Sequence, residues 1–530
     1  MRPIVTLACV TTLAACGRPA EPAPADAPRL VVLVTIDQMR SDYLPRFEHH
    51  LTGGLGRLIQ GGAYYPYAAH DHANTETAPG HAAAWSGRFP ASTTIISNDR
   101  GVPDTTVQLL DSRGPGASPV RFEGESLFDR IKARSPTARA LSVSRKDRGA
   151  ILAVGRAREA VYWYAPEGRF TTSTYYANAL PAWVRAFNAR KLPERMAGRV
   201  WTPLLPDSAY AEADGQAFEA GGQDVEFPHV MPEDSAQAAR TLLEWPWMDD
   251  VTLAFALAGV EALALGTEPG MDVLAVSLSA TDAVGHRYGP DSREIHDHIV
   301  RLDRMLGAFI DSLYRLRDST GIVIALTGDH GVAPFPELHT DRTGEVTGHV
   351  SLRSQLSAVR AGLADRGVPA AAFRLETDQL WVDRAAFVAA GVSADSVVAV
   401  FADLVRAVPG VQRADLVSAL ATADTTHDKI ARRWVHSLSP NFPIELVVTL
   451  EPYWVWGRGR DAQHGSPWDY DTFVPLVLYG VPFQPGRHPD TVRTVDLAPT
   501  LAAGLGVSFD APTDGHVLVN SLKHRPTTDR

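Results

Sequence analysis

The chain has 530 residues, of which 45% are hydrophobic and 21% are charged, and its formal net charge is -11. These proportions are ordinary for a globular enzyme, and the length predicts two or more domains, or one domain with long insertions. The negative charge and the lack of a basic run argue against binding to nucleic acid, because proteins that bind nucleic acid normally present a basic face.

The N-terminus predicts an export signal. Residues 1–16 begin with Met1-Arg2, continue as an apolar stretch too short to span a membrane, and end in Leu13-Ala-Ala-Cys16. This ending resembles a bacterial lipoprotein signal, in which the cysteine becomes the lipidated first residue. The alternative is an ordinary cleaved signal with a chance cysteine. Residues 17–28, rich in Pro and Ala, are typical of a flexible linker.

We therefore expect an exported bacterial protein that is either periplasmic or anchored to a membrane by lipid on Cys16. Both cysteines of the chain, Cys9 and Cys16, lie in this leader. The folded body consequently forms no disulfide and offers no thiolate, so any metal site in it must use nitrogen and oxygen ligands.

Three short apolar runs, rich in β-branched residues, predict strands buried on both faces of a parallel sheet. With the aspartate that follows each run, they are residues 30–36 and Asp37, 272–278 and Asp282, and 321–326 and Asp329. Parallel sheets bind ligands at the carboxyl ends of their strands. His286 and His330 stand at ligand spacing from the second and third aspartates. The pattern indicates a metal centre.

Residues 74–87 predict a turn that leads into a helix, with Pro79 near its first position and Gly87 beyond its last. Thr77 would stand just before the helix N-terminus, where unpaired backbone N–H groups and a partial positive charge favour an anion. A hydroxyl there is a candidate nucleophile. Taken alone, a threonine before a helix is more often a plain cap, so the metal ligands must support this interpretation.

Residues 140–144 predict a further strand, which is followed by Lys146 and Arg148. In an extended chain these two cations would point the same way, although such pairs are more often a solvated face. Residues 149–233 lack clean periodicity and predict long loops that shape the site. Residues 292–317 keep helical spacing and predict the crossover helix between the second and third metal-bearing strands.

The pattern changes in residues 341–440, where polar segments, a short strand and an amphipathic helix predict an inserted subdomain. The core would then comprise residues 29–340 and 441–530, resuming with a strand at 444–450. His464 follows, in front of a glycine. A lone histidine there is more often a loop residue, but a site for two metals still needs a nitrogen ligand.

The fold class predicted is α/β, with a doubly wound, mostly parallel sheet, helices on both faces and an inserted α+β subdomain. The candidate ligands are three aspartates and three histidines, namely Asp37, Asp282, His286, Asp329, His330 and His464. A mixed oxygen and nitrogen set of this size suits two zinc ions. Two ions about 4 Å apart can hold the attacking and the leaving oxygen of a phosphoryl transfer.

These motifs together resemble the alkaline phosphatase superfamily, and within it the bacterial phosphate-irrepressible alkaline phosphatases that have a threonine nucleophile. The similarity runs from Leu30 to about Leu518. Its motifs are Val34-Thr-Ile-Asp-Gln-Met-Arg40, Thr77-Ala-Pro-Gly-His81, Ile96-Ser-Asn98-Asp99, Lys146-Asp-Arg148-Gly149, Thr281-Asp-Ala-Val-Gly-His286, Gly328-Asp-His-Gly331 and His464-Gly-Ser466.

The resemblance implies a phosphate monoester hydrolase that acts by double displacement through a phosphothreonine on Thr77. It assigns one zinc to Asp37, Asp329 and His330 beside Thr77, and the other zinc to Asp282, His286 and His464. It assigns the phosphoryl oxygens to Asn98, Lys146 and Arg148. No clear ligand set for a third metal is evident, so a bound Mg2+ is not expected. We expect a monomer that acts on small phosphate monoesters.

Two alternatives stay open. A phosphodiesterase of the same superfamily would share the metal ligands and the threonine, but a diester has an organic group where Lys146 and Arg148 would meet charged oxygen. A surface lipoprotein that only binds zinc or phosphate is the non-enzymatic alternative, and an intact Thr77 beside a full ligand set argues against it. A sulfatase would require Cys or Ser in place of Thr77. His81 is expected to be a structural helix residue that does not affect metal content.

Overall fold

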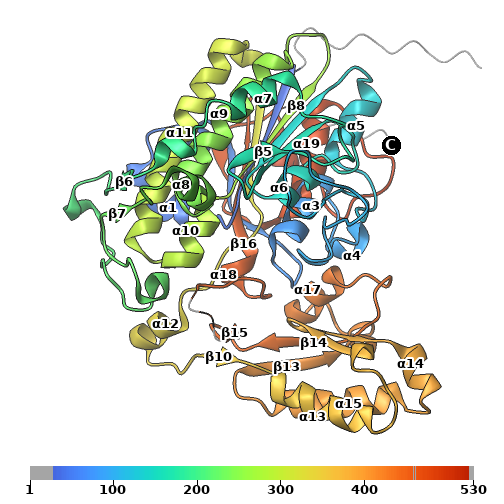
Figure 1. Ribbon diagram of the computed structural model, residues 1–530. Coiled ribbons are helices and arrows are strands. Elements are labelled where there is room, and N and C mark those ends of the chain that lie inside the picture. The colour runs from blue at the N-terminus through green and yellow to red at the C-terminus, as the bar shows by residue number, and fades with distance from the viewer. Residues whose placement is uncertain (1–27, 458, 460, 524–530) are drawn as a thin grey trace, which may run out of the picture.

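The computed structural model describes residues 28–457, 459 and 461–523 (Figure 1). The predicted leader, and with it Cys16, lies outside the described residues, as does all of the predicted linker except Pro28. Within the described part of the chain, no helix has the length and apolar character needed to cross a lipid bilayer.

A ten-stranded sheet forms the middle of the core, in the order β17-β2-β16-β9-β1-β8-β3-β4-β5, with β18 also beside β2. Five adjacent strands are parallel: β9 (Ile322–Gly328), β1 (Leu30–Ile36), β8 (Asp272–Leu278), β3 (Ala140–Ser144) and β4 (Ala160–Ala165). The antiparallel pairings join β16 (Phe473–Tyr479) to β9 and β2 (Ala63–Ala69), and β5 (Arg169–Thr171) to β4. Short strands β17 (Gly486–Arg487) and β18 (Val492–Arg493) are parallel to β2. The predicted mostly parallel α/β sheet is confirmed.

Helices cover both faces of this sheet, because successive residues of a strand point to opposite sides. Leu30, Val32 and Val34 of β1 belong to a core packed by α2 (Gly54–Gly61), α9 (Trp247–Ala262) and α11 (Arg293–Leu316). Val31 and Leu33 belong to a second core, packed by α3 (Thr77–Ser86), α5 (Leu127–Arg134), α6 (Asp147–Leu152) and α19 (Leu497–Leu505). The fold is therefore doubly wound, as predicted.

The register of the central strands brings their carboxyl ends to one edge. Ile36, the last residue of β1, pairs with Leu278 of β8 and with Gly328 of β9. Asp37 and Asp329 therefore emerge at the same level, and Asp282 follows four residues after β8, in the first turn of α10 (Ala280–Tyr288). The predicted crossover helix is α11, which Ser292 caps.

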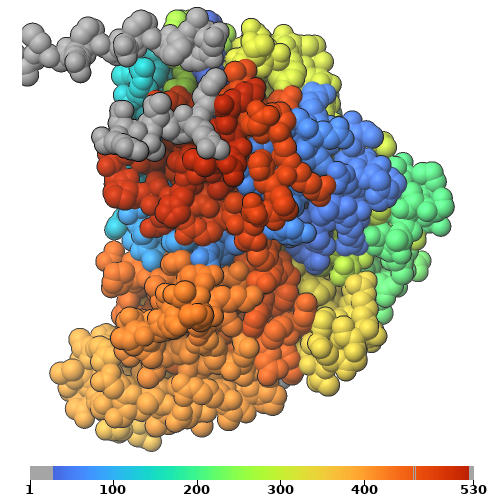
Figure 2. All heavy atoms as spheres, turned by 180° about the vertical axis from the view of Figure 1, so that it is seen from behind, coloured from blue at the N-terminus to red at the C-terminus, as the bar shows by residue number. Residues whose placement is uncertain are grey.

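A second, antiparallel sheet forms the inserted subdomain, seen as the lower lobe in Figures 1 and 2. Its strands are β11 (Phe373–Glu376), β12 (Gln379–Val382), β14 (Ile444–Leu450) and β13 (Val411–Leu416), and its helices include α13 (Arg353–Ala364), α14 (Arg384–Ala389) and α15 (Ala394–Arg406). The strand at 444–450 was predicted to resume the core, and that prediction is wrong. This strand is apolar because hydrophobic clusters lie on both of its faces, just as they do in the core. The core sheet resumes only at β16.

Residues 149–233, predicted as loops with short elements, also contribute β4 and β5 to the central sheet. The other named elements are α1 (Tyr43–Phe47), α4 (Pro90–Thr93), α7 (Ala182–Asn188), β6 (Val200–Trp201), β7 (His229–Val230), α8 (Ser235–Thr241), α12 (Pro336–Thr343), β10 (His349–Val350), α16 (Val417–Leu420), α17 (Lys429–Ser437), β15 (Val455–Trp456) and α18 (Asp469–Thr472).

Candidate metal centre and nucleophile

Thr77 is the first residue of α3, and it is 1% exposed. The preceding Glu76 is extended, with φ -114 and ψ 164, and Gly87 ends the helix in the left-handed region at φ 71, where glycine is favoured. The predicted turn and helix are confirmed. The hydroxyl of Thr77 therefore lies at a helix N-terminus, where the helix dipole favours negative charge.

Gly80 explains how this helix approaches the sheet so closely. A Cβ atom at this position would lie 2.0 Å from the carbonyl oxygen of Asp329. Any other residue would push α3 away from the end of β9. The glycine in the Thr77-Ala-Pro-Gly-His81 motif is thus a packing requirement that keeps the start of α3 beside the candidate ligand Asp329.

The six predicted ligands form two groups within the described part of the chain. One group contains Asp37, Asp329 and His330, and the other contains Asp282, His286 and His464; in each, one ligand atom per residue lies within 4.8 Å of the others. The first group is fully buried, whereas the His286 side chain is 34% exposed. The structure therefore brings together the same two triads that the resemblance implied.

All three histidines are oriented for metal binding. Nδ1 of His330 donates to the Gly331 carbonyl at 2.9 Å. In the other triad, Nδ1 of His286 donates to Ala462 at 2.5 Å and Nδ1 of His464 donates to Thr75 at 2.8 Å. A carbonyl oxygen only accepts, so each Nδ1 carries a proton, and in the neutral ring Nε2 is the nitrogen that keeps a lone pair. His330 Nε2 lies 3.4 Å from Asp37 Oδ1, and His286 Nε2 lies 3.2 Å from Asp282 Oδ1.

Buried polar atoms without partners show that these residues fit divalent cations. Oδ1 of Asp37 and Nε2 of His330 are buried with no hydrogen-bond partner among the described residues. Burial, together with the charges of Asp282 and Asp329, raises the pKa of Asp37, and burial lowers the pKa of His330 to about 4. Neutral imidazole and crowded carboxylates are a donor set that cations stabilise. The two triads are thus candidate sites for two metal ions.

Lys146 lies between the two triads and next to Thr77, the candidate nucleophile. Its Nζ is 2.6 Å from Asp37 Oδ2, 2.7 Å from Asp282 Oδ2 and 3.1 Å from Thr77 Oγ1. Burial opposes ionisation of Asp282, but the charge of Lys146 and the interactions with His286 and His464 together outweigh burial and hold the pKa of Asp282 well below its usual value. A buried cation therefore faces the Thr77 hydroxyl.

Asn98 also reaches the start of the nucleophile helix. Its side-chain Oδ1 accepts a hydrogen bond from the backbone N–H of Ala78 at 2.9 Å. The backbone N–H of Asn98 donates to Glu76 Oε2 at 2.6 Å. Both predicted residues, Asn98 and Lys146, are thus placed around Thr77.

Arg148 differs from its prediction, because the chain is not extended after Lys146. Lys146 caps α6, and Arg148 lies in the first turn of that helix. Burial raises the pKa of Glu76, and the Arg148 charge is among the influences that oppose this rise, which places Arg148 near the start of α3. The apolar pattern of residues 140–144 predicts the strand, but it does not predict that a helix begins three residues later.

Two further residues hold the ligands in place. Gln38, with φ 63, donates its backbone N–H to Asp329 Oδ1 at 3.0 Å and its Nε2 to Asp282 Oδ1 at 3.1 Å. Gln38 directly follows Asp37 and is not among the site residues predicted from the sequence. His81 is buried in α3 as predicted, but its Nδ1 lies 3.1 Å from Asp329 Oδ2. His81 thus contacts a candidate metal ligand, and its purely structural role stays a prediction.

The inserted subdomain forms hydrogen bonds with the segment that leads to Thr77. Ser437 of α17 accepts the Ala73 N–H at 2.7 Å, and Arg432 Nε lies 3.0 Å from Asp71 Oδ2. On the other side, Thr75 Oγ1 donates to the Ser466 carbonyl at 2.9 Å. The turn before the nucleophile is thus held between the subdomain and the segment that carries His464.

The sequence places the protein in a known family. The family described as type I phosphodiesterase / nucleotide pyrophosphatase matches residues 31–465. Because this match covers most of the chain, the protein belongs to that family and, with it, to the alkaline phosphatase superfamily.

Individual members of the superfamily are similar to this chain in sequence and in fold. The chain is 30% identical to "Alkaline phosphatase PhoK" of Sphingomonas sp, over 90% of this chain and 88% of that protein. It is also 30% identical to a protein of Myroides odoratus named "Calcium-transporting ATPase", over 91% and 93% of the two chains. The crystal structure of wild-type alkaline phosphatase PafA matches with a TM-score of 0.85 at 25% identity, over 94% of this chain and 99% of that chain. The protein is thus a hydrolase of the alkaline phosphatase superfamily with a PafA-like fold.

Proposed function

We propose that the protein is a phosphate monoester hydrolase that uses Thr77 as its nucleophile. The observation that carries this proposal is the position of Lys146 Nζ, 3.1 Å from Thr77 Oγ1 and between the two candidate metal triads. A buried cation at this position favours the ionised hydroxyl and a dianionic phosphoryl group. Small phosphate monoesters carry such a group.

We further propose that two Zn2+ ions are the cofactors, one held by Asp37, Asp329 and His330 and the other by Asp282, His286 and His464. The lack of thiolates and the mixed carboxylate and imidazole set support zinc. Bound zinc would supply Lewis acidity to the entering and the leaving oxygen of the reaction.

The chain's own residues carry the remaining steps. Thr77 Oγ1 loses its proton and forms a bond to phosphorus while the ester P–O bond breaks, so the alcohol leaves with a proton and a phosphothreonine remains. Water then attacks phosphorus and Thr77 Oγ1 leaves, which releases inorganic phosphate and restores the hydroxyl. Lys146, Asn98 and Arg148 are proposed to bind the nonbridging oxygens, since they surround the start of α3.

A phosphodiesterase is the second candidate, and the description of the matched family favours it. The side chain of Lys146 argues against it, because this buried cation gains most from a third charged oxygen, which a diester lacks. A protein that only binds zinc or phosphate would have no need of a buried hydroxyl beside the metal triads.

The discriminating experiment compares kcat/KM for p-nitrophenyl phosphate and for bis(p-nitrophenyl) phosphate with the zinc-loaded protein. We expect the monoester to be favoured by at least about 100-fold, the effect of losing one desolvated charged contact in the transition state. A preference for the diester would make the protein a phosphodiesterase. If neither ester is turned over at full metal content, the protein only binds zinc or phosphate and is not an enzyme for these esters.

Export is a separate proposal that rests on residues 1–28 of the sequence. Lipid on Cys16 would anchor the protein to a membrane, and Cys16→Ser should then move the phosphatase activity from the membrane fraction to the soluble fraction. Wild-type activity that is already soluble in the periplasm would contradict the anchor but not export. We also propose a monomer, which sedimentation of the purified protein would test.

A further inference from the structure

Gln38 donates a hydrogen bond to each of the two candidate metal triads. Its backbone N–H reaches Asp329 Oδ1 at 3.0 Å, and its side-chain Nε2 reaches Asp282 Oδ1 at 3.1 Å. The residue is fully buried, and its φ of 63 lies in the left-handed region, which residues other than glycine rarely adopt. Such residues persist only where the surrounding structure holds them, and they cluster at functional sites. The two hydrogen bonds indicate what that function is.

Both hydrogen bonds end on the carboxylate oxygen that lies nearest to a histidine of the same triad. Asp282 Oδ1 lies 3.2 Å from His286 Nε2, and Asp329 Oδ1 lies 3.7 Å from His330 Nε2. A carboxylate oxygen has more than one lone pair, so it can accept from Gln38 and still offer a lone pair to a cation. Gln38 therefore holds one candidate ligand oxygen of each triad.

The orientation of the Gln38 amide follows from its partners. The carboxylate and the backbone carbonyl oxygen of Asp282 both accept, so the NH2 group of the amide faces Asp282. The amide Oε1 lies toward Gly285 of α10 and is buried with no hydrogen-bond partner among the described residues. A Cβ atom on Gly285 would lie 1.8 Å from this Oε1, and the three atoms nearest to it all belong to the Gln38 side chain. Glycine at position 285 thus makes room for the amide.

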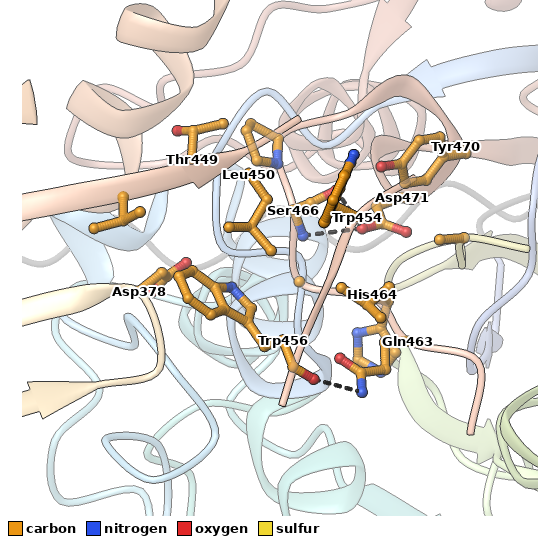
Figure 3. A pocket seen from close by; sticks show the side chains of 15 residues that line it. Asp378, Thr449, Leu450, Trp454, Trp456, Gln463, His464, Ser466, Tyr470 and Asp471 are labelled. Atoms are coloured by element: carbon orange, nitrogen blue, oxygen red, sulfur yellow. Dashed lines mark hydrogen bonds between the residues drawn. The ribbon is translucent and has the colours of Figure 1, made fainter. Parts of the chain in front are cut away.

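The two histidines of the exposed triad are held by other contacts. Nδ1 of His286 and Nδ1 of His464 each donate to a backbone carbonyl oxygen. Beside His464, Gln463 donates to the carbonyl oxygen of Trp456 at 3.0 Å, as Figure 3 shows. The carboxylate is the ligand of this triad that Gln38 holds.

We propose that Gln38 is a positioning residue, whose side-chain amide holds the ligand oxygen of Asp282 in place and so sets the zinc affinity of the exposed triad. The proposal rests on the two zinc sites proposed above and does not depend on which ester is hydrolysed. Lys146 binds the other carboxylate oxygen of Asp282, Oδ2, at 2.7 Å, so a substitution at Gln38 leaves that contact in place.

Gln38→Gly tests this proposal, because it removes the amide while glycine accepts the φ of 63 and keeps the backbone N–H. Competition with a chelator measures the two zinc affinities, and His464→Ala identifies the one that belongs to the exposed triad. We expect Gln38→Gly to weaken zinc binding at the exposed triad by about tenfold or more, and at the buried triad by about twofold or less. Gln38→Met, which keeps the length of the side chain but cannot donate, should show the same loss.

A double variant separates positioning from a general effect on folding. Gly285→Ala should also weaken zinc binding at the exposed triad by about tenfold, because its methyl group would displace the amide. In Gln38→Gly that methyl group has room, so the double variant should bind zinc as weakly as Gln38→Gly alone. Gly362→Ala, in α13 with no atom within 4 Å of the added Cβ, is the matched control and should keep both affinities.

Losses that multiply to about 100-fold in the double variant would show that Gln38 and Gly285 act independently, and they would overturn the proposal. Unchanged zinc affinity in both Gln38→Gly and Gln38→Met, or equal weakening at both triads, would also overturn it. Fewer than two zinc ions bound by the wild type would instead defeat the proposed zinc sites, and this inference with them.

Discussion

The two halves of the candidate metal centre are built differently. Asp37, Asp329 and His330 directly follow parallel strands in the middle of the sheet, and their side chains are fully buried. Asp282 and His286 stand on helix α10, and His464 comes from the segment after the inserted subdomain. The His286 side chain is 34% exposed and that of His464 is 10% exposed.

This difference corresponds to the two ends of the proposed reaction. The nucleophile side has one invariant task, so rigid strand ends and close packing at Gly80 suit it. The leaving-group side must admit different alcohols, and residues on a loop and a helix can adapt to them. Four predictions test this division, from the largest expected effect on activity to the smallest.

The largest effect is expected from removing ligands of the two triads. Asp37→Ala should lower kcat/KM for a monoester by at least about 1,000-fold, and added zinc should not restore it, because the buried side cannot recruit a replacement ligand. His464→Ala should be partly restored by excess zinc, since water can reach the open side. Elemental analysis should find two metals in the wild type and fewer in each variant. Equal losses and equal restoration would remove the distinction between the two halves.

The next effect concerns the cation between the two triads. Lys146→Ala should slow monoester hydrolysis by roughly 100-fold and diester hydrolysis much less, because only the monoester offers a third charged oxygen. Arg148→Ala should have a smaller effect, since Arg148 lies in the first turn of α6 and its guanidinium pairs with Asp147 at 3.6 Å. The measurement is the ratio of monoester to diester kcat/KM. Equal losses for both esters would mean that Lys146 supports the fold or the metals instead.

A smaller effect is expected at His81, which supports the buried half. Its Nδ1 lies 3.1 Å from Asp329 Oδ2. His81→Ala should therefore weaken binding of the metal proposed for the buried triad by about 10-fold or more. Titration with a competing chelator measures this affinity, and His427→Ala, on an exposed histidine, is the control. Unchanged affinity would restore the interpretation of His81 as a structural residue alone.

The smallest effect on activity is expected at Glu219, in a short 3-10 helix (Glu219–Gly222) that packs against α10. Burial, followed by the nearby charge of Glu294, raises the pKa of Glu219 from 4.5 to about 9. Between these values the folded protein holds a proton that the unfolded chain has lost, so this carboxyl lowers stability as pH rises from about 4.5 to 9. Glu219→Gln removes the titration. Its melting temperature should therefore exceed that of the wild type more at about pH 8 than at about pH 5.

A uniform shift in melting temperature at both pH values would show that Glu219 does not titrate in this range. Activity and metal content should stay near the wild-type values, because Glu219 belongs to neither triad. A loss of metal from the triad of Asp282, His286 and His464 would instead show that the position of α10 depends on its packing against Glu219–Gly222.

The sequence alone determined the metal-bearing strands and the residues that follow them. The predicted bounds 30–36 and 272–278 agree with β1 and β8, because a strand buried on both faces must be continuously apolar. Asp37, Asp329 and His330 could be assigned for the same reason: they directly follow such strands. The helix after Thr77 was equally readable from Pro79 and Gly87, whose backbone preferences are local.

Only the tertiary structure decided which strands pair and which side chains meet. The strand at 444–450 has the same apolar pattern as a core strand, but it pairs with β12 in the subdomain, because burial on two faces does not specify a partner. The contacts of Gln38 and His81 with the candidate ligands Asp282 and Asp329 were likewise not predictable from the sequence. Each depends on segments far apart in the chain being brought together by packing, which no local spacing records.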